Sequence, residues 1–372
     1  MLNNLLPEGF KDEVSDIAST EHKYKNKIIQ IFLSNGYKLV KAPLIEFSTA
    51  LDNKNSLRIK VNKGEKNLTL RDDITMQIAR ISSSRLSKMY RPLKLCYYGE
   101  VVRNKGSMLR PERQFLQIGA ECIGEKSYLA DVEMMELSYE ALTSVGIKNI
   151  SIELSSKLFL NKIYDNIGSL SKKDKLKSFI KKKDLTNSLK LVDLKYHKYL
   201  IDIFSCTGNF IYKKDNLESL KINDDNISEI ENLKKINKKF LKTYKNVSFF
   251  LDLTEVDEKY YHKGICFTIF ANNVRGEIVK GGRYISNKIS GQEDATGFTC
   301  YMDTILRASS NIETIKKIIV PFDISVAEKE KLISKNFVIE KFFGSNEELK
   351  KNALNRKFEY CLYKNKIIRL RS

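Results

Sequence analysis

The sequence predicts an α+β fold, in which helices flank a mainly antiparallel sheet, with a helical insertion and a small C-terminal α/β unit. Three observations lead to this prediction. Strand patterns recur over 97–124 and 249–289, the Lys-rich segment 157–245 is mostly helical by pattern, and residues 316–372 alternate strand and helix signals. We therefore expect a larger domain over 1–315, with the insertion at about 157–245, and a smaller domain over 316–372.

The N-terminal part predicts a helix over 19–35, followed by a strand. Thr20 is a plausible N-cap, an apolar face follows over 28–33, and Gly36 ends the helix. The run GYKLVKAPLIEF alternates as a strand, which Pro43 breaks because proline cannot donate to a sheet ladder. Residues 67–71 form a further short strand. A helix then begins near Asp73 and Thr75, which by themselves indicate only a helix cap.

The block from Tyr97 to Gly124 indicates a strand, a turn and a return strand. On the return strand, side chains at odd positions share one face, which would hold Phe115, Gln117, Gly119 and Glu121. Such a face could form the floor of a site for a small polar ligand, because Gln donates and accepts hydrogen bonds and Glu pairs with an ammonium group. An ordinary solvated sheet face explains this block equally well.

The remaining elements follow from local patterns. Ser127 caps a helix predicted over 127–145, and 149–154 is a strand. The segments 249–253, 264–271 and 277–284 read as successive hairpins of an antiparallel sheet. A Gly-rich strand then leads into a helix over 295–307. In 316–372 two strand–helix pairs precede closing strands.

Composition narrows the function classes. Hydrophobic residues make up 42% of the chain, yet no apolar run of about 18 residues predicts a membrane span. The six cysteines and three histidines are scattered, so we expect neither a disulfide framework nor a metal site, no cofactor, and a cytoplasmic location. The net charge of +19 reflects a Lys-rich composition along the whole chain, and the Lys tracts are typical of solvated helix faces, so we do not expect specific nucleic-acid binding.

The block 97–124 resembles motif 2 of class II aminoacyl-tRNA synthetases, in the histidyl-tRNA synthetase branch, which reads FRxE…RQFxQxGxExxG. Arg103 matches the motif arginine. The helix and strand up to residue 47 resemble motif 1, and 295–307 resembles motif 3. The text LRxDxTxQxAR at 70–80 is more similar to the paralogous family of ATP phosphoribosyltransferase regulatory subunits, which Asp73, Thr75 and Gln77 match. The resemblance implies a class II synthetase-like fold.

The resemblance also implies a retained site for histidine. The residues that match the family's histidine-binding positions are Asp73, Thr75, Arg103, Gln117, Glu121, Tyr260 and Tyr261. We expect Glu121 and Gln117 to bind the ammonium group and Arg103 the carboxylate, while Asp73 or a tyrosine hydroxyl orients the imidazole ring.

The same resemblance implies loss of amino-acid activation, and we expect no catalytic residues. Family arginines fall at Val256 and Thr304 in this chain, and the acidic residue of FRxE falls at Lys105. Removing one preorganised charge donor commonly costs about 3–4 kcal/mol in the barrier, so losing two would leave little activity.

Regulatory subunits of this family imply a short-form ATP phosphoribosyltransferase catalytic subunit as partner, for the first step of histidine biosynthesis. We expect a homodimer, through the N-terminal helix and strand, within a hetero-octamer, and feedback inhibition by histidine as effector. Two alternatives are an active histidyl-tRNA synthetase of reduced size and a tRNA-binding protein with the synthetase fold.

Overall fold

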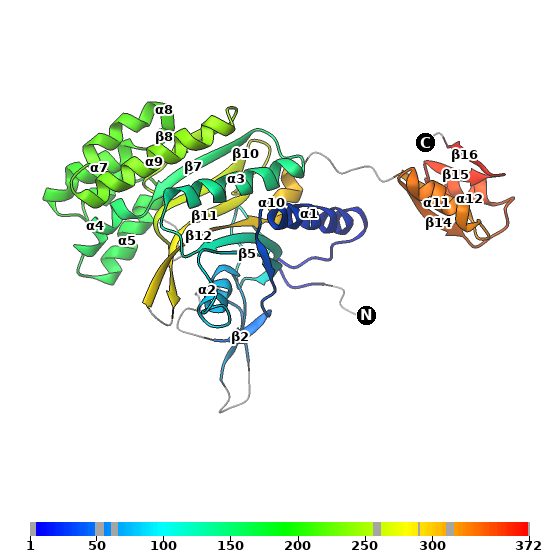
Figure 1. The fold of residues 1–372 in the computed structure, drawn as a ribbon, viewed down its shortest axis with the longest axis horizontal. Coiled ribbons are helices and arrows are strands. Elements are labelled where there is room, and N and C mark those ends of the chain that lie inside the picture. The colour runs from blue at the N-terminus through cyan, green and yellow to red at the C-terminus, as the bar shows by residue number, and fades with distance from the viewer. Residues whose placement is uncertain are drawn as a thin grey trace. The chain divides into compact units, whose positions relative to one another are not determined.

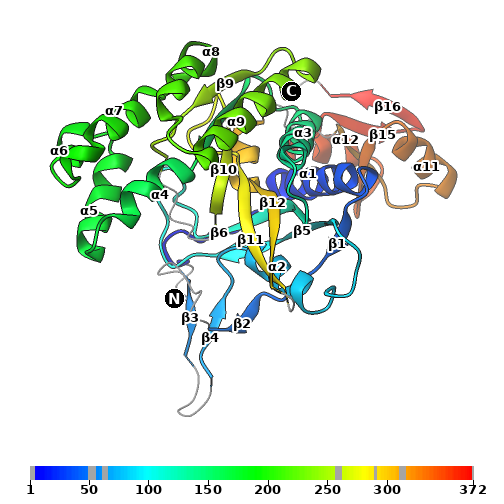
Figure 2. The same cartoon turned by 60° about the vertical axis from the view of Figure 1, so that its left-hand side comes forward.

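The structure is a computed structural model that describes residues 5–48, 56–60, 66–255, 262–288, 291–309 and 316–370. The chain divides into two compact units, 1–310 and 311–372. Figures 1 and 2 show the large unit as a sheet with helices on both faces. No helix among the described residues is both long and apolar enough to cross a membrane.

The first helix, α1 (Ser15–Ser34), begins earlier than predicted. Thr20 is therefore no N-cap but lies inside the helix, where its hydroxyl donates to the Asp16 carbonyl. The next strands are β1 (Lys38–Val40), β2 (Ile45–Phe47), β3 (Arg58–Ile59) and β4 (Leu68–Leu70). The predicted break at Pro43 is confirmed, because β1 joins the main sheet whereas β2 pairs with β4 in a small separate sheet.

The main sheet has nine strands among the described residues, in the order β1-β5-β6-β12-β11-β10-β7-β9-β8. Pairing is parallel at β1–β5 and β7–β9 and antiparallel elsewhere, which confirms the mainly antiparallel prediction. The strands are β5 (Leu93–Val102), β6 (Gln114–Ile123), β7 (Ile150–Ser156), β8 (Gly208–Asn209), β9 (Ser248–Leu251), β10 (His262–Ala271), β11 (Val279–Lys288) and β12 (Gly291–Tyr301).

The predicted hairpin between β9 and β10 is wrong. Strand β7 lies between them, and β9 runs parallel to β7. The connection over 252–261 is much longer than a hairpin turn, so nothing local holds the two strands together. Alternation along a strand specifies which face is buried but not which strand is its neighbour. The hairpins β10–β11 and β11–β12 do form.

Helices cover both faces of the main sheet (Figures 1 and 2). One face carries α1, α3 (Tyr128–Ser144) and α10 (Met302–Ala308), and the other carries α2 (Thr75–Ser83). The prediction for α3 is confirmed at its start, where the Ser127 hydroxyl accepts from the Leu129 amide. The α1–α3 face is an extensive apolar core, whereas the core under α2 is smaller.

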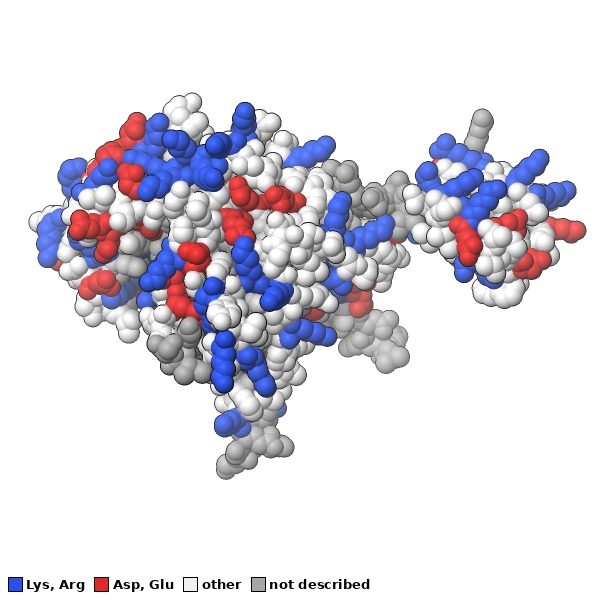
Figure 3. All heavy atoms as spheres, viewed as in Figure 1, with Lys and Arg blue, Asp and Glu red and all other residues white. Residues whose placement is uncertain are grey.

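The region expected as a helical insertion is fully described and mostly helical. It contains α4 (Leu158–Asp165), α5 (Leu170–Lys181), α6 (Leu185–Leu189), α7 (His197–Ser205), α8 (Phe210–Lys213) and α9 (Asp224–Thr243), besides short 3₁₀ turns. Helix α9 buries Ile230, Leu233 and Phe240 and exposes its lysines. Figure 3 shows lysines gathered over this helix, as expected for a solvated face.

The small unit has its own four-stranded sheet in the order β14-β13-β15-β16. Its elements are β13 (Lys316–Pro321), α11 (Val326–Ser334), β14 (Phe337–Phe342), α12 (Leu349–Asn355), β15 (Tyr360–Tyr363) and β16 (Lys366–Arg369). Ile318 and Ile319, adjacent in β13, pack in two different apolar clusters, so both sheet faces are covered.

Candidate functional site

Strand β6 carries two polar side chains on the face that α2 covers. Gln117 and Glu121 are both 0% exposed, with Gly119 between them. Leu116, Ile118 and the following even residues pack instead in the α1–α3 core. The predicted sharing of one face is confirmed, and the alternative of a solvated sheet face is wrong because both polar groups are buried.

Glu121 lies deepest in this site. Its carboxylate accepts hydrogen bonds from the hydroxyls of Tyr97 at 3.2 Å and Tyr284 at 3.0 Å. Burial raises the pKa of Glu121 to about 8, and the hydrogen bond from Tyr284 opposes that shift in part. The site therefore holds a carboxyl group that changes charge near neutral pH and would gain from a cationic partner.

The N-terminal end of α2 lies at the same site as Gln117 and Glu121. The Gln117 Oε1 atom accepts from the Ile74 amide at 3.3 Å, and Asp73 caps the helix by accepting from the Thr75 amide at 2.8 Å. The Gln117 Nε2 atom is buried and has no partner in the described structure. The fold thus brings Asp73, Thr75, Gln117 and Glu121 together and leaves one buried donor for a ligand to satisfy.

Glycines leave room beside the carboxylate. Gly297 of β12 lies opposite Glu121, and Gly282 of β11 lies opposite Gly297. A Cβ atom on Gly297 would collide with the Glu121 carboxylate, and one on Gly119 would collide with the Tyr97 side chain. The missing side chains at Gly297 and Gly119 therefore let Glu121 and Tyr97 pack directly against the strands.

Arg103 lies at the margin of this group. Its guanidinium stacks 4.8 Å from the ring centre of Phe115, two residues before Gln117 on the same face. Its side chain has no described contact with Gln117 or Glu121. Tyr260 and Tyr261 lie outside the described residues, as does Val256.

Sequence reasoning missed two tyrosines of the site. Tyr97 is fully buried, and its hydroxyl lies within hydrogen-bond distance of Thr299 at 2.8 Å and of Thr75 at 3.3 Å. Tyr284 contacts Glu121 from β11. Both face the site only because of sheet register: Tyr97 lies opposite Gly119. Alternation within the β5 strand was the one signal that could have found Tyr97.

Arg110 was also missed, and it occupies the region around Thr304. Its Nε atom donates to Asp303 at 3.0 Å, its Nη1 atom to Glu277 at 3.3 Å and its Nη2 atom to the Thr304 hydroxyl at 3.2 Å. The guanidinium also lies 3.8 Å from the centre of the Tyr301 ring. This buried cation is thus neutralised by carboxylates of the chain itself.

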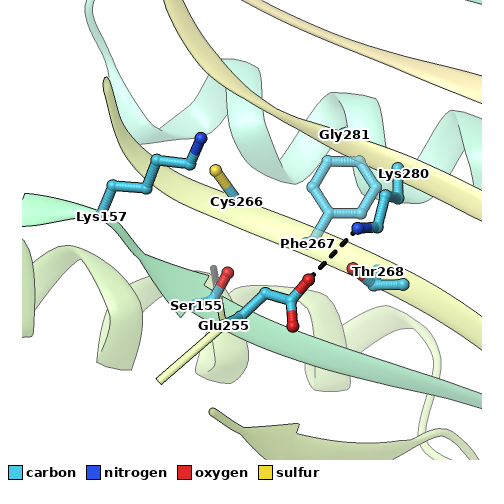
Figure 4. A pocket seen from close by; sticks show the side chains of 8 residues that line it. All are labelled: Ser155, Lys157, Glu255, Cys266, Phe267, Thr268, Lys280 and Gly281. Atoms are coloured by element: carbon cyan, nitrogen blue, oxygen red, sulfur yellow. Dashed lines mark hydrogen bonds and ion pairs between the residues drawn. The ribbon is translucent and has the colours of Figure 1, made fainter. Parts of the chain in front are cut away.

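A small cavity opens on the same sheet face, where β7, β10 and β11 run side by side (Figure 4). Ser155, Lys157, Cys266 and Lys280 contribute polar groups to its wall. Lys280 forms an ion pair with Glu255 at 3.2 Å, drawn as a dashed line in Figure 4.

An acidic cluster adjoins this cavity. Carboxylate oxygens of Glu153, Asp252 and Glu255 lie within 4.8 Å of one another. Burial, with the neighbouring charge of Asp252, raises the pKa of Glu153 to about 7. Lys183 binds Asp252 and Lys280 binds Glu255, so ammonium groups balance two of the three carboxylates, and the raised pKa of Glu153 favours its neutral form. We assign no metal ion to it.

Comparisons with known proteins identify similar sequences and folds. A sequence profile described as histidyl-tRNA synthetase matches residues 9–305. The chain is 31% identical to an ATP phosphoribosyltransferase regulatory subunit of Rhodospirillum centenum, over 88% of this chain and 86% of the relative. It is also 31% identical to the protein of that name from Paramagnetospirillum magneticum, over 85% of each chain.

Solved structures share the fold. One is described as an ATP phosphoribosyltransferase regulatory subunit/histidyl-tRNA synthetase from Bacillus halodurans C, with a TM-score of 0.80, 20% identity and 98% of each chain covered. Another is a histidyl-tRNA synthetase from Nostoc, with a TM-score of 0.76 and 16% identity over 97% of this chain and 91% of that one.

Proposed function

The chain belongs to the histidyl-tRNA synthetase-like family of ATP phosphoribosyltransferase regulatory subunits, and on that premise we propose that it senses histidine for this enzyme. It is a non-catalytic subunit that acts with a catalytic partner. The partner we propose is a short-form ATP phosphoribosyltransferase, which joins ATP and phosphoribosyl pyrophosphate in the first step of histidine biosynthesis. A homodimer of this chain within a hetero-octamer is the assembly we propose.

The buried pair of Glu121 and the unpartnered Gln117 Nε2 atom carries the proposal. A fully buried carboxylate without a cation is costly, and so is a buried amide donor without an acceptor. A small zwitterion satisfies both, because it brings one positive and one negative group into the same space. Histidine adds a ring that can donate and accept hydrogen bonds through its two nitrogens.

Glu121 and Gln117 converge on the α2 start, since Gln117 accepts from Ile74 and a hydrogen bond from Thr75 lowers the pKa of Glu121. The Glu121 carboxylate suits the ammonium group of the ligand, and the Gln117 Nε2 donor suits an acceptor such as an imidazole nitrogen. Asp73 and Thr75 adjoin it, and Tyr260 and Tyr261 complete the proposed set on family resemblance alone.

The region around Thr304 supports a non-catalytic role. Activating an amino acid needs cations aimed at the phosphates of ATP. Here Thr304 is fully buried and accepts from Arg110, whose charge Asp303 already neutralises. Arg307 is likewise paired with Glu112.

Feedback inhibition requires that histidine prefer one of two arrangements of the complex. The coupling free energy is then the difference between its affinities for the two. A buried carboxyl that changes its charge on ligand binding can supply such a difference, because its neighbours Tyr97 and Tyr284 must reorganise with it.

The first experiment is reconstitution of the enzyme. Phosphoribosyl-ATP formation by the short catalytic subunit is measured with and without this chain, and histidine is then titrated. We expect activity only with the chain and inhibition by histidine. An unchanged rate would contradict the regulatory role, and histidine-dependent ATP–pyrophosphate exchange by this chain alone would favour a synthetase instead.

The second experiment locates the ligand. Glu121→Gln keeps the shape of the side chain but removes its charge, and we expect histidine affinity measured by calorimetry to fall about 10–100-fold. Glu229→Gln is the matched control, because Glu229 is also a buried carboxyl of raised pKa but contacts Ser156 on the opposite sheet face. Equal histidine affinity of wild type and Glu121→Gln would contradict the assignment of Glu121 to the histidine site.

A further inference from the structure

The sheet face that carries Glu121 continues across the neighbouring strands. Register places Gly297, Gly282, Cys266 and Ser155 in one row with it, across β12, β11, β10 and β7. Two adjacent glycines in that row carry no side chains, so the Glu121 carboxylate packs against Gly297 and the Cys266 side chain against Gly282. Site and cavity are therefore parts of one continuous face.

The next row along the strands carries a cation. Gly119, Thr299, Lys280 and Thr268 lie side by side on β6, β12, β11 and β10. The Thr299 hydroxyl contacts the Tyr97 hydroxyl, which in turn donates to Glu121. Lys280 is thus one strand away from the hydrogen-bonded group of the site and on its face.

We propose that Lys280 binds the carboxylate group of the effector and so determines its selectivity for an α-amino acid. This inference rests on the proposed histidine site and deepens it. It assigns to Lys280 the role that sequence reasoning gave to Arg103, whose guanidinium instead stacks on Phe115.

The Lys280 side chain is long enough for this role. Neighbouring strands lie about 4.8 Å apart, so β6 and β11, with β12 between them, are separated by roughly 10 Å. Lysine presents its ammonium group on a flexible four-carbon stem, and Glu121 reaches out from the other side. Glu121 and Lys280 thus supply an anion and a cation on one sheet face, which complement the two charges of a small zwitterion.

The ion pair between Lys280 and Glu255 can be exchanged. The side chains of Lys280 and Glu255 are 25% and 33% exposed, and such partly solvated ion pairs contribute little stability. A ligand carboxylate replaces the Glu255 carboxylate without leaving a buried cation unpaired.

Ser155 and Thr268 add hydroxyl donors to the same cavity, and Lys157 adds a second ammonium group (Figure 4). This wall suits an anion better than an apolar group. It gives the carboxylate end of the ligand a polar environment distinct from the Glu121 end.

The test compares two ligands on two proteins. Histidinol carries a hydroxymethyl group in place of the carboxylate of histidine. Wild type is expected to bind histidine about 10–100-fold more tightly than histidinol. In Lys280→Met, histidine affinity falls to the histidinol level while histidinol affinity stays within about twofold of wild type.

Arg103→Met is the matched control and is expected to keep the preference for histidine. Glu255→Gln is a second variant, which removes the competing carboxylate and raises affinity for histidine but not for histidinol. Equal losses for both ligands in Lys280→Met, or a preference lost in Arg103→Met instead, overturn the inference while the histidine site stands. If wild type binds neither ligand, the proposed function itself fails.

Discussion

The two faces of β6 differ in what they bury. The even residues Leu116, Ile118 and Ala120 pack into the α1–α3 core, whereas Gln117 and Glu121 point to the α2 side. From Phe115 to Ile123 both faces are buried, yet only the face toward α2 carries a buried carboxyl and a buried amide side chain. The apolar face stabilises the fold in proportion to its buried area, and the polar face keeps buried groups without full partners.

Within one ten-residue strand, β6 (Gln114–Ile123), the residues that stabilise the fold thus lie on one face and the proposed ligand-binding residues on the other. A buried carboxylate with a raised pKa and a donor without an acceptor both reduce stability in the absence of ligand. Such groups are expected where a ligand supplies what the chain lacks. The contrast can be tested by changing one face at a time.

The largest effect on stability is expected on the apolar face. Ile118→Ala removes a fully buried side chain and should lower the free energy of unfolding by about 2–5 kcal/mol. Denaturant titration measures this change, and histidine affinity of the folded variant should stay the same. Its counterpart on the other face is Gln117→Met, which removes the acceptor of the Ile74 amide together with the unpartnered Nε2 donor. It should lower stability less than Ile118→Ala and weaken histidine binding. A reversed pattern would contradict the division between the faces.

A smaller effect is expected from pH. Unfolded Glu121 ionises near 4.5 and the folded residue near 8, so the folded state binds more protons between these values. The free energy of unfolding should therefore fall as pH rises from 4.5 to 8, by at most about 1.4 kcal/mol per unit, and level off above. Glu121→Gln should lack this component. Subtracting its pH profile from that of wild type removes the parallel contributions of Glu153 and Glu229.

Histidine affinity should show the opposite pH trend. The ligand ammonium pairs with the ionised form of Glu121, so affinity rises as pH approaches 8, and Glu121→Gln should abolish that rise. Calorimetry in two buffers of different ionisation heat measures the proton released on binding. Binding without proton release at pH 7 would contradict the pairing.

The smallest effect is expected from one hydroxyl. Tyr284→Phe removes the 3.0 Å hydrogen bond to the Glu121 carboxylate and should change stability by about 1 kcal/mol. Because that bond favours the ionised carboxylate, the pKa of Glu121 should rise further, which moves the pH profile of histidine affinity upward. An unmoved profile would mean that Tyr284 does not tune Glu121.

Local signals predicted the elements well. The Ser127 cap, the break at Pro43 and the shared face of Gln117 and Glu121 are all confirmed, because each depends on residues within one turn or one strand. The start of α1 was placed too late, since no side chain caps it and Thr20 offered a plausible alternative. Local sequence patterns could not predict that β7 and β9 are neighbours in the sheet.

The sequence by itself determined the α+β class, the alternation of side chains along β6 and the family motif around Arg103. These features depend only on the order of residues along the chain. Only the tertiary structure decided which groups meet. Tyr97 and Tyr284 reach Glu121, Arg110 lies against Thr304, and Lys280 lies on the same sheet face as Glu121. These contacts depend on register between strands far apart in the chain, which packing sets and composition does not.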